Sequence, residues 1–349
     1  MQKKNIALLF GGCSSEYDIS LKSASAVVQH IDRETVELIM IGITRQGEWY
    51  RYSGSPANIA DDSWHTDPRC IRAILSPDRH THGIVLFSEN GAETIRIDAA
   101  FPLLHGKNGE DGTVQGLLEL AGIPVIGCGT LASALCMDKD IAHKLAEAAG
   151  IMVPRSLVIR NNAAFEQTVK KAATLSYPLF VKPARSGSSF GITKVVREDQ
   201  LREAVLHAFE HDQKVIVEQA VDGFEVGCAI VGAEELIVGE VDEVELSQGF
   251  FDYTEKYSLK TSRIHMPARI SQQDAERVKE AAITVYRALE CSGFARVDFF
   301  FTPHGEIVFN EVNTIPGFTA HSRFPTMLKG IGLSFAEIVD KLIRQAVTV

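Results

Sequence analysis

The segment from residue 294 to residue 313 constrains the fold of this chain more than any other. It alternates apolar with polar residues on both sides of Pro303, His304 and Gly305. Alternation with a period of two predicts half-buried β-strands, and turn residues between two such runs predict an antiparallel hairpin. We expect His304 and Gly305 to form a two-residue loop, because a terminal glycine favours such turns. This loop fixes which residues of the two strands lie opposite each other.

Four polar residues of this hairpin form the predicted chemical centre. The two-residue loop places Asp298 opposite Glu311 and Arg296 opposite Asn313, with all four side chains on one face. Two adjacent carboxylates repel each other unless a cation lies between them, and carboxylate and amide oxygens suit Mg²⁺. Arg296 would stabilise negative charge on a transferring group. The alternative is a solvated hairpin face on which Arg296 pairs with an acid, and another loop length would separate the two acids.

Short β-rich segments alternate with amphipathic helical segments along the chain. In the first part, the expected strands lie at 6–10, 36–44, 95–104 and 123–127, and the expected helices at 20–31 and 113–121. Strands separated by helices favour a largely parallel sheet. The pattern restarts twice, so we expect three units: an α/β unit at 1–135, a smaller α+β unit at 136–220 and a C-terminal unit at 221–349.

The charge and cysteine content exclude several classes of protein. The chain has 45 acidic and 35 basic residues, a net charge of −10, which argues against nucleic acid or an anionic membrane as the partner. A local cluster of Lys and Arg could still hold a small anion. No apolar run approaches the roughly 20 residues that a bilayer span needs. The six cysteines form no CxxC pair and no metal spacing, so we expect reduced thiols in the cytoplasm.

Two further segments could bind a nucleotide. Lys182 ends an expected strand and precedes a Gly/Ser-rich loop up to Gly191, whose amides and hydroxyls could surround a phosphate, although it is not a Walker A sequence. Glu218 ends the next expected strand and Glu225 follows it, so they could bind the adenine and ribose edges. Taken alone, the first segment is a weak signal because surface loops are rich in Gly and Ser, and a solvated acidic turn explains the second better than a nucleotide site.

The N-terminal glycine-rich turn differs from the familiar nucleotide and hydrolase motifs. Residues 11–16 follow an expected strand and open a helix but lack GxGxxG, so a nicotinamide-dependent oxidoreductase is disfavoured. The helix N-terminus could hold a carboxylate and Glu16 a substrate ammonium group. A second glycine-rich turn starts at His105. No GxSxG motif supports serine-based hydrolysis.

Together these segments resemble the D-alanine–D-alanine ligase family of ATP-grasp enzymes over essentially the whole chain. The matching blocks are Gly11–Glu16, His105–Gly112, Met137–Lys139, Lys182–Gly191, Asp252–Tyr257 and Asn310–Gly317, in family order. The resemblance implies an ATP-grasp fold with an N-terminal parallel-sheet, Rossmann-like, substrate-binding domain, a small central domain and a C-terminal catalytic domain. It also implies a cytoplasmic homodimer that phosphorylates D-alanine with ATP, after which the amine of a second D-amino acid attacks the acyl phosphate.

The resemblance also implies roles for individual residues. ATP would be held by Lys139, Lys182, Ser189, Glu218, Glu225 and Lys256, and two Mg²⁺ (or Mn²⁺) ions by Asp298, Glu311 and Asn313. Arg296 and the Gly317 amide would stabilise the tetrahedral intermediate. The remaining roles in substrate binding would fall to Glu16, His105, Ser188, Tyr257 and Ser322.

Three departures from the usual family pattern concern the second substrate. Phe251 replaces the first tyrosine of a Tyr-Asp-Tyr block, Arg323 replaces an apolar residue after His-Ser, and Tyr17 replaces the commoner histidine after Glu16. At these three positions the chain resembles the D-alanine–D-serine ligases of the VanC, VanE and VanG vancomycin-resistance type. An arginine can engage a hydroxyl that an apolar side chain cannot. We therefore expect D-alanine and D-serine as substrates.

Several alternatives remain open at this point. Arg323 could instead form a rim salt bridge without any role in specificity, and the product could be D-Ala-D-Ala. A lactate ester is disfavoured because Lys256 and Tyr257 of the loop are retained. From another class, the chain could be a non-catalytic ATP-binding regulator, although Arg296, Asp298 and the other metal-site residues are all present.

Overall fold

The computed structural model describes residues 3–89, 91–160, 165–172, 174–187, 190–246 and 262–347. Five residues with a predicted role lie outside this description: Ser188, Ser189, Phe251, Lys256 and Tyr257. Among the described residues, no helix has the length and apolar character needed to cross a bilayer.

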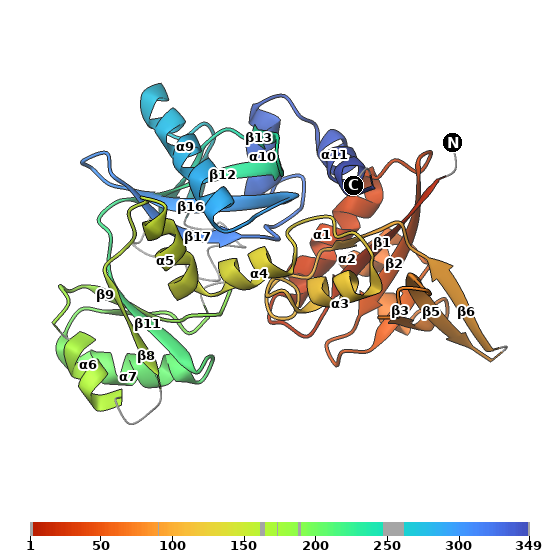
Figure 1. The fold of residues 1–349 in the computed structure, drawn as a ribbon, viewed down its shortest axis with the longest axis horizontal. Helices are drawn as coiled ribbons and strands as arrows, with labels where there is room; N and C mark the ends of the chain where they lie inside the picture. The colour runs from red at the N-terminus through yellow and green to blue at the C-terminus, as the bar shows by residue number, and fades with distance from the viewer. Residues whose placement is uncertain are drawn as a thin grey trace.

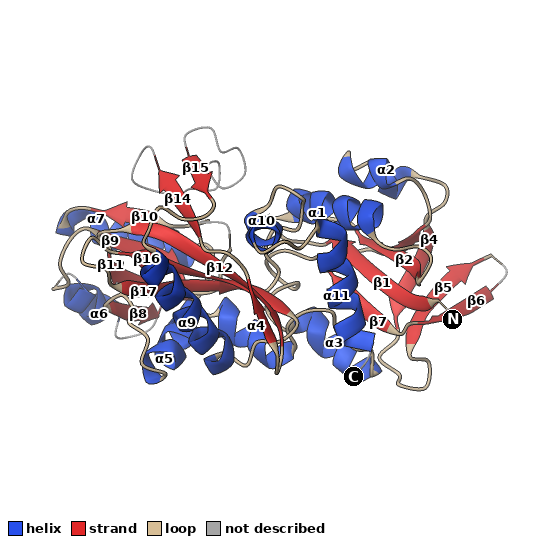
Figure 2. Ribbon diagram, turned by 90° about the horizontal axis from the view of Figure 1, so that it is seen from above, coloured by secondary structure: helices blue, strands red, loops and turns tan. Residues whose placement is uncertain are grey.

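The N-terminal unit is a seven-stranded sheet with helices on both faces (Figures 1 and 2). Its strands are β1 (Lys4–Gly11), β2 (Val36–Ile43), β3 (Trp49–Tyr52), β4 (Ile71–Leu75), β5 (Gly83–Ser88), β6 (Gly91–Arg96) and β7 (Ala99–Pro102), in the order β6-β5-β4-β3-β2-β1-β7. Helices α1 (Tyr17–His30) and α11 (Phe335–Val347) pack on one face, and α3 (Thr113–Ala121) packs on the other. A short helix, α2 (Pro56–Ala60), packs beside α1. The buried side chains of β1 alternate between the two faces, as a doubly covered strand requires.

The parallel pairing predicted from the sequence holds for β2, β1 and β7, whereas β3 to β6 extend the sheet with antiparallel pairs. The expected strand at 95–104 is divided into β6 and β7 because the chain bends at Asp98, whose carboxylate accepts a hydrogen bond from the Asn5 amide at 2.8 Å. The expected strand at 123–127 is reduced to one bridge between Ala100 and Val125. Pro124 has no N–H to donate to a ladder, which prevents a longer pairing.

A four-stranded and a six-stranded sheet form the other end of the molecule (Figure 1). The smaller one contains β8 (Ser156–Arg160), β9 (Leu179–Pro183), β10 (Thr193–Val195) and β11 (Lys214–Gln219), with α6 (Phe165–Ala172) and α7 (Glu198–Phe209) against it. The larger one contains β12 (Phe224–Gly232), β13 (Leu236–Val238), β14 (Asp242–Leu246), β15 (Ser262–His265), β16 (Phe294–Phe301) and β17 (Ile307–Asn313). Both sheets are antiparallel in the pairs described.

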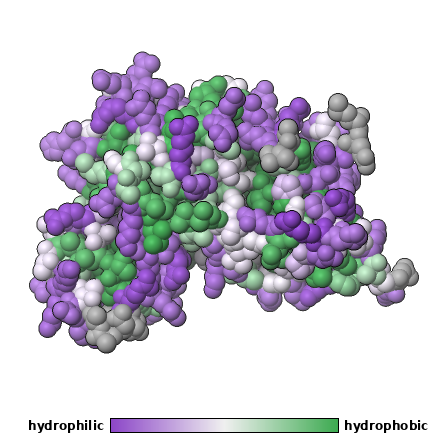
Figure 3. Space-filling view, in the orientation of Figure 1, coloured by the Kyte–Doolittle hydropathy of each residue, from purple (hydrophilic) through white to green (hydrophobic). Residues whose placement is uncertain are grey.

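Helices cover the larger sheet unequally, which leaves room for a site. One face packs against α4 (Thr130–Met137), α5 (Lys139–Ala148) and α9 (Gln272–Ala288), and α10 (Arg323–Gly330) packs on the other. Figure 3 shows a mostly hydrophilic surface with apolar side chains gathered over α4, where Leu131 is 60% exposed. The face of β16 that carries Arg296 and Asp298 lies toward α10 and the N-terminal unit.

The functional hairpin has the predicted pairing but not the predicted loop. Asp298 lies opposite Glu311 and Arg296 opposite Asn313, which confirms the expected neighbours. The loop has three residues, because the Thr302 amide donates to the Glu306 carbonyl and Gly305 takes a left-handed conformation with φ of 76°. The register then shifts between Asp298 and Phe299. This bulge adds one residue to β17 and offsets the longer loop, so the polar pairs are restored.

Aromatic packing joins the N-terminal unit to the larger sheet. The ring of Phe294 on β16 lies 5.9 Å from Phe101 of β7, 5.5 Å from Phe318 and 5.4 Å from Phe324 of α10, measured between ring centres. All four rings are fully buried. Edge-to-face and tilted aromatic pairs of this kind add to the stabilisation from burial. The cluster therefore fixes how the two ends of the molecule meet.

We expect Phe294→Ala to lower the free energy of unfolding by about 3 to 5 kcal/mol, because it removes a buried ring that contacts three others. Urea denaturation followed by tryptophan fluorescence measures this change. Phe87→Ala is the matched control, since Phe87 is 45% exposed and its loss should cost less than about 0.5 kcal/mol. Equal effects of the two substitutions would contradict the importance of the cluster.

Candidate active site

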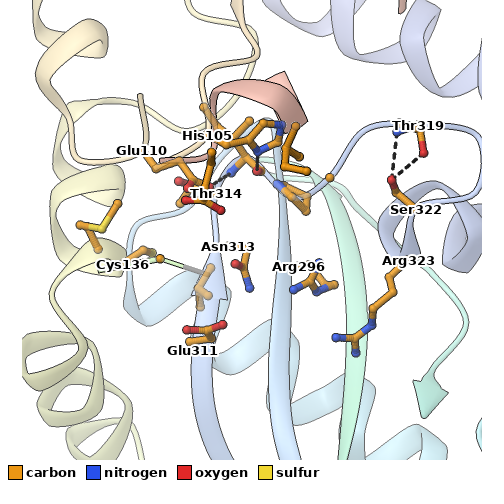
Figure 4. A pocket seen from close by; sticks show the side chains of 18 of the residues that line it. His105, Glu110, Cys136, Arg296, Glu311, Asn313, Thr314, Thr319, Ser322 and Arg323 are labelled. Carbon is orange, nitrogen blue, oxygen red and sulfur yellow. Dashed lines mark hydrogen bonds between the residues drawn. The ribbon is translucent and has the colours of Figure 1, made fainter. Parts of the chain in front are cut away.

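A cavity of about 320 Å³ lies where the three sheets converge. Its walls come from the N-terminal unit, from the start of α5, from the loop at 186–187 and from the segment between β17 and α10. Of the residues with a predicted role, it brings together Glu16, His105, Lys139, Arg296, Glu311, Asn313, Gly317, Ser322 and Arg323. Figure 4 shows most of these side chains pointing into one space.

Two of the predicted metal ligands, Glu311 and Asn313, line this cavity, and Asp298 is buried next to Asn313. Asp298 is 1% exposed and accepts hydrogen bonds from Arg296 Nε at 2.8 Å and from Arg296 Nη2 at 2.7 Å. Asn313 Nδ2 donates to Asp298 Oδ2 at 2.9 Å. Lys139 Nζ lies 3.2 Å from Glu311 Oε2. The polar face of the hairpin is therefore part of a cavity wall. The alternative of a hairpin face exposed to solvent does not hold.

These oxygen donors fit a hard divalent cation. Two carboxylates and one amide oxygen from neighbouring positions match the ligands that Mg²⁺ takes in proteins. In the described structure, their negative charge is balanced by Arg296 and Lys139. A divalent ion could replace these cations, which would free both for a phosphate group.

The predicted nucleotide ligands fall in two places. Lys182 Nζ pairs with Glu218 Oε1 at 2.6 Å, and both side chains are almost fully buried. Lys139 Nζ donates to the Ser186 carbonyl at 3.0 Å and so ties α5 to the glycine-rich loop. Glu225 instead contacts Arg323. Lys139 and Lys182 thus lie on either side of the strand end that leads into the glycine-rich loop, each already paired with an acceptor of the protein.

His105 holds together the loops around the cavity. Its Nε2 lies 3.0 Å from Ser23 Oγ on α1, and its Nδ1 lies 2.8 Å from the Ile315 carbonyl. Ser23 Oγ also accepts a hydrogen bond from the Phe318 amide at 3.2 Å. Burial lowers the pKa of His105, which favours the neutral ring. These contacts fix the backbone on both sides of Gly317, whose amide is the predicted oxyanion donor.

Glu110 is a functional candidate that the sequence reasoning did not single out. Its carboxylate accepts hydrogen bonds from the Gly106 amide at 2.8 Å and from the Ile315 amide at 3.0 Å. Burial, reinforced by the nearby Glu16 charge, raises the pKa of Glu110 to about 8. Only its position in the same glycine-rich turn as His105 could have indicated, from the sequence, that Glu110 belongs to the site. It positions the segment that leads to Gly317.

Arg323 forms a buried ion network and does not lie on the rim. Its Nε and Nη2 each donate to one oxygen of Asp242 at 2.7 Å, and its Nη1 donates to Glu225 at 2.6 Å. Nη2 also lies 3.4 Å from Asp298 Oδ1. Asp242, which is 1% exposed, was missed because nothing in its alternating strand distinguishes it from other strand acids. A rim salt bridge is therefore ruled out.

Tyr17, one of the three departures from the usual family pattern, does not line the cavity. Its hydroxyl donates to Asp62 Oδ1 at 2.7 Å and accepts from Trp64 Nε1 at 3.2 Å. Its ring is buried in the N-terminal core. The preceding Glu16 is also buried, and a Cβ atom at Gly106 or Gly187 would come within 2.6 Å of Glu16 Oε2. Only glycine allows both loops to approach this carboxylate.

The loop that follows β17 presents the remaining predicted residues. Ser322 Oγ lies 2.8 Å from Thr319 Oγ1 and accepts from the Thr319 amide at 3.1 Å, as the dashed lines in Figure 4 show. A Cβ atom at Gly317 would lie 3.2 Å from Ser322 Oγ. The Gly317 backbone and the Ser322 hydroxyl thus occupy one corner of the cavity, next to Arg323.

Comparisons with known proteins find relatives along nearly the whole chain. Two family models match the chain: D-ala D-ala ligase N-terminus over residues 5–128 and D-ala D-ala ligase C-terminus over residues 145–344. The vancomycin B-type resistance protein VanB of Enterococcus faecalis is 47% identical, with 99% of each chain covered. A D-alanine–D-alanine ligase of Caldicellulosiruptor bescii is 44% identical, with 99% of this chain and 96% of the relative covered.

A solved structure is also similar along its whole length. The crystal structure of the VanG D-Ala:D-Ser ligase from Enterococcus faecalis superposes with a TM-score of 0.93 and 57% identity, covering 99% of this chain and 100% of that chain. The expected ATP-grasp fold is confirmed by these neighbours. The chain therefore belongs to the D-alanine–D-alanine ligase family, whose members use ATP and a divalent metal.

Proposed function

We propose that this protein joins D-alanine to D-serine in an ATP-dependent reaction and so supplies D-Ala-D-Ser for peptidoglycan precursors that resist vancomycin. The observation that carries the choice of D-serine is the buried pair of Arg323 and Asp242 beside Ser322 and Gly317. A buried polar pair at this corner can hydrogen-bond a substrate hydroxyl and penalises an analogue that lacks it. The name of the 57% identical VanG neighbour supports the same choice.

The residues of the cavity suggest how the reaction would be organised. Lys139 and Lys182 would neutralise the ATP phosphates, and Asp298, Glu311 and Asn313 would hold two Mg²⁺ or Mn²⁺ ions. Bound there, the metal would supply charge stabilisation for the transferring phosphoryl group. Arg296 would leave its partner Asp298. Together with the Gly317 amide, it would then stabilise the negative charge that develops on the acyl centre. Glu16 would bind the ammonium group of the first D-alanine.

A second candidate is the D-alanine–D-alanine ligase of ordinary cell-wall synthesis, which differs only in the attacking amine. It is favoured by the 44% identity to the Caldicellulosiruptor bescii enzyme. It would require the corner at Arg323 to accept a methyl group. That corner presents the buried guanidinium of Arg323, which prefers a polar partner.

Three further features belong to the proposal. The three sheets, which span residues 4–102, 156–219 and 224–313, support domains at 1–135, 136–220 and 221–349.

We propose a homodimer on the resemblance to the family, for which sedimentation equilibrium should give twice the 38.2 kDa of one chain. Fractionation of the host cell should recover the protein with the cytoplasm.

The function is tested by product analysis with purified protein, ATP, Mg²⁺ and labelled D-alanine, with and without D-serine at neutral pH. We expect ADP release and a predominance of D-Ala-D-Ser whenever both amino acids are present in equal amounts. Predominance of D-Ala-D-Ala would overturn the serine assignment and support the second candidate. Absence of ADP release in every mixture would instead indicate a non-catalytic ATP-binding protein.

Replacing Arg323 with methionine should lower the preference for D-serine over D-alanine, expressed as the ratio of kcat/KM values, by about tenfold or more. The ratio is insensitive to a partial loss of folded protein. Lys329→Met, at an exposed position on the same helix, is the matched control. Because Arg323→Met leaves Asp242 buried without its partner, the double variant Arg323→Met with Asp242→Asn should show the same lowered ratio. An unchanged ratio in both variants would exclude Arg323 from specificity.

Asp298→Asn should reduce kcat by about 100-fold or more and raise the Mg²⁺ concentration needed for half-maximal rate, because a carboxylate ligand is lost. Chelation with EDTA should stop ADP release by the wild-type protein, and added Mg²⁺ or Mn²⁺ should restore it. Asp199→Asn, with a side chain 69% exposed, should behave as wild type. A normal Mg²⁺ dependence in Asp298→Asn would remove this residue from the metal site.

A further inference from the structure

Two histidines and a glutamate gather at the end of α7, outside the catalytic cavity. Helix α7 lies in the central unit, at the end of the molecule away from the N-terminal sheet (Figure 1). His207 lies in its last turn, and Glu210 and His211 follow the helix directly. One ligand atom of each residue lies within 4.8 Å of the other two, and all three residues are exposed. In the described part of the chain, no other three His, Cys, Asp or Glu side chains gather in this way.

The backbone holds the three side chains on one face. Helical hydrogen bonding continues past the last residue of α7, because the Glu210 amide donates to the His207 carbonyl at 3.1 Å. The His211 amide donates to the Ala208 carbonyl, also at 3.1 Å. Residues three and four positions apart on a helical turn are neighbours. The C-terminal end of a helix also carries partial negative charge, which favours a cation there.

The His211 ring packs against the end of the glycine-rich loop. A Cβ atom at Gly191 would lie 2.5 Å from His211 Cδ2 and 2.9 Å from Pro183 Cγ, so only glycine admits the ring here. The His207 and His211 rings meet edge to face, with centres 5.5 Å apart and an angle of 89° between their planes. The side chains of His207 and Glu210 are 51% and 70% exposed. One ligand is therefore held by packing, while the other two can adjust to an ion.

The spacing suits a tetrahedral metal ion. Two ligand atoms bound to one Zn²⁺ at about 2.0 to 2.1 Å, with a tetrahedral angle, lie about 3.3 Å apart. His207 Nδ1 and Glu210 Oε2 are already 3.4 Å apart. Since the three ligand atoms lie within 4.8 Å of one another, the remaining approach is about 1.5 Å at most. Rotation of the exposed His207 and Glu210 side chains can supply it.

The ligand set selects the class of ion. Imidazole nitrogens suit transition metals such as Zn²⁺, Cu²⁺ and Ni²⁺, whereas the oxygen donors at Asp298 and Glu311 suit hard ions such as Mg²⁺. Two histidines and one glutamate are a set that Zn²⁺ takes in proteins, with water in the fourth position. The exposure of the group leaves room for that water. The group therefore differs in its metal preference from the oxygen donors of the cavity.

We propose that His207, Glu210 and His211 bind one divalent transition-metal ion of the Zn²⁺ class, with water as the fourth ligand. Each residue contributes one bond to the metal, and no electron is transferred. The ion would restrain the turn that precedes Asp212, which accepts hydrogen bonds from the Arg185 amide at 2.9 Å and from the Arg185 guanidinium at 2.8 Å. Because Arg185 belongs to the glycine-rich loop, the metal would stabilise the support of that loop.

The test is a titration of the full-length protein with Zn²⁺ in excess Mg²⁺, in competition with a chromogenic Zn²⁺ chelator and without added thiols. We expect wild type to take up one equivalent. His207→Asn and His211→Asn should each bind it about tenfold more weakly or worse, since even an outer-shell partner of a metal contributes about 10- to 100-fold. No uptake by wild type, or equal affinity in wild type and His211→Asn, would overturn the proposal.

His65→Asn is the matched control for these variants. His65 also pairs with an acid three positions away, its Nδ1 lying 3.7 Å from Asp62 Oδ1, but no histidine follows four positions on. It should therefore retain wild-type affinity. Asp298→Asn should retain the equivalent as well, because the ion does not occupy the catalytic cavity. Loss of uptake in Asp298→Asn would place the ion in that cavity and overturn the proposal.

X-ray absorption of the wild-type protein loaded with one equivalent of Zn²⁺ in excess Mg²⁺ gives a second readout that needs no variant. We expect only nitrogen and oxygen neighbours at about 2.0 to 2.1 Å, two of them imidazole nitrogens. A sulfur neighbour at about 2.3 Å would overturn the proposal by placing the ion at a cysteine. A shell of oxygens alone would do the same. Because neither measurement uses turnover, the outcome is independent of whether the product is D-Ala-D-Ser.

Discussion

The structure of the cavity depends on the compensation of buried carboxylates by buried cations. Asp298, Asp242, Glu218 and their neighbours are almost fully removed from water, where an unpaired charge would be very costly. Arg323 of α10 holds Asp242, Lys182 of β9 holds Glu218, and Arg296 holds Asp298 on its own strand, β16. ATP and divalent ions bring charges of both signs. The lysines and arginines can therefore turn to the phosphates, and the carboxylates to the metal ions, without any buried charge being left uncompensated.

A second requirement is that the segment after β17 be fixed, because it carries Gly317 and leads to Arg323. Its backbone is anchored from the N-terminal unit, through His105, Ser23 and Glu110. The aromatic cluster around Phe294 holds the two units at this junction. The N-terminal unit thus positions backbone of the C-terminal unit through side chains of α1 and of the turn at residues 105–110. Glu110 is as much a part of this arrangement as the residues that would contact the substrates.

In the hairpin at 294–313, the predicted residue pairs are right, whereas the predicted turn length and uniform register are wrong. The alternating pattern identified both strands, and Asp298 and Glu311 are neighbours as expected. The turn has one residue more than a terminal glycine suggested, and a bulge in β17 compensates. Local sequence specifies strands through burial, but a bulge depends on packing against other elements. Periodicity alone could not distinguish the two solutions.

The sequence by itself determined the strand and helix pattern, the family and the polar residues of the hairpin, because periodicity and short motifs are local properties. Tertiary structure decided which neighbours those residues have. Asp242 became the partner of Arg323, Glu110 became an anchor for the Ile315 amide, and Tyr17 turned out to face the N-terminal core. Cys136 and Cys291, which form no spacing motif, were brought within 3.6 Å of each other. Such contacts join residues up to 205 positions apart, and only the packing of sheets and helices fixes them.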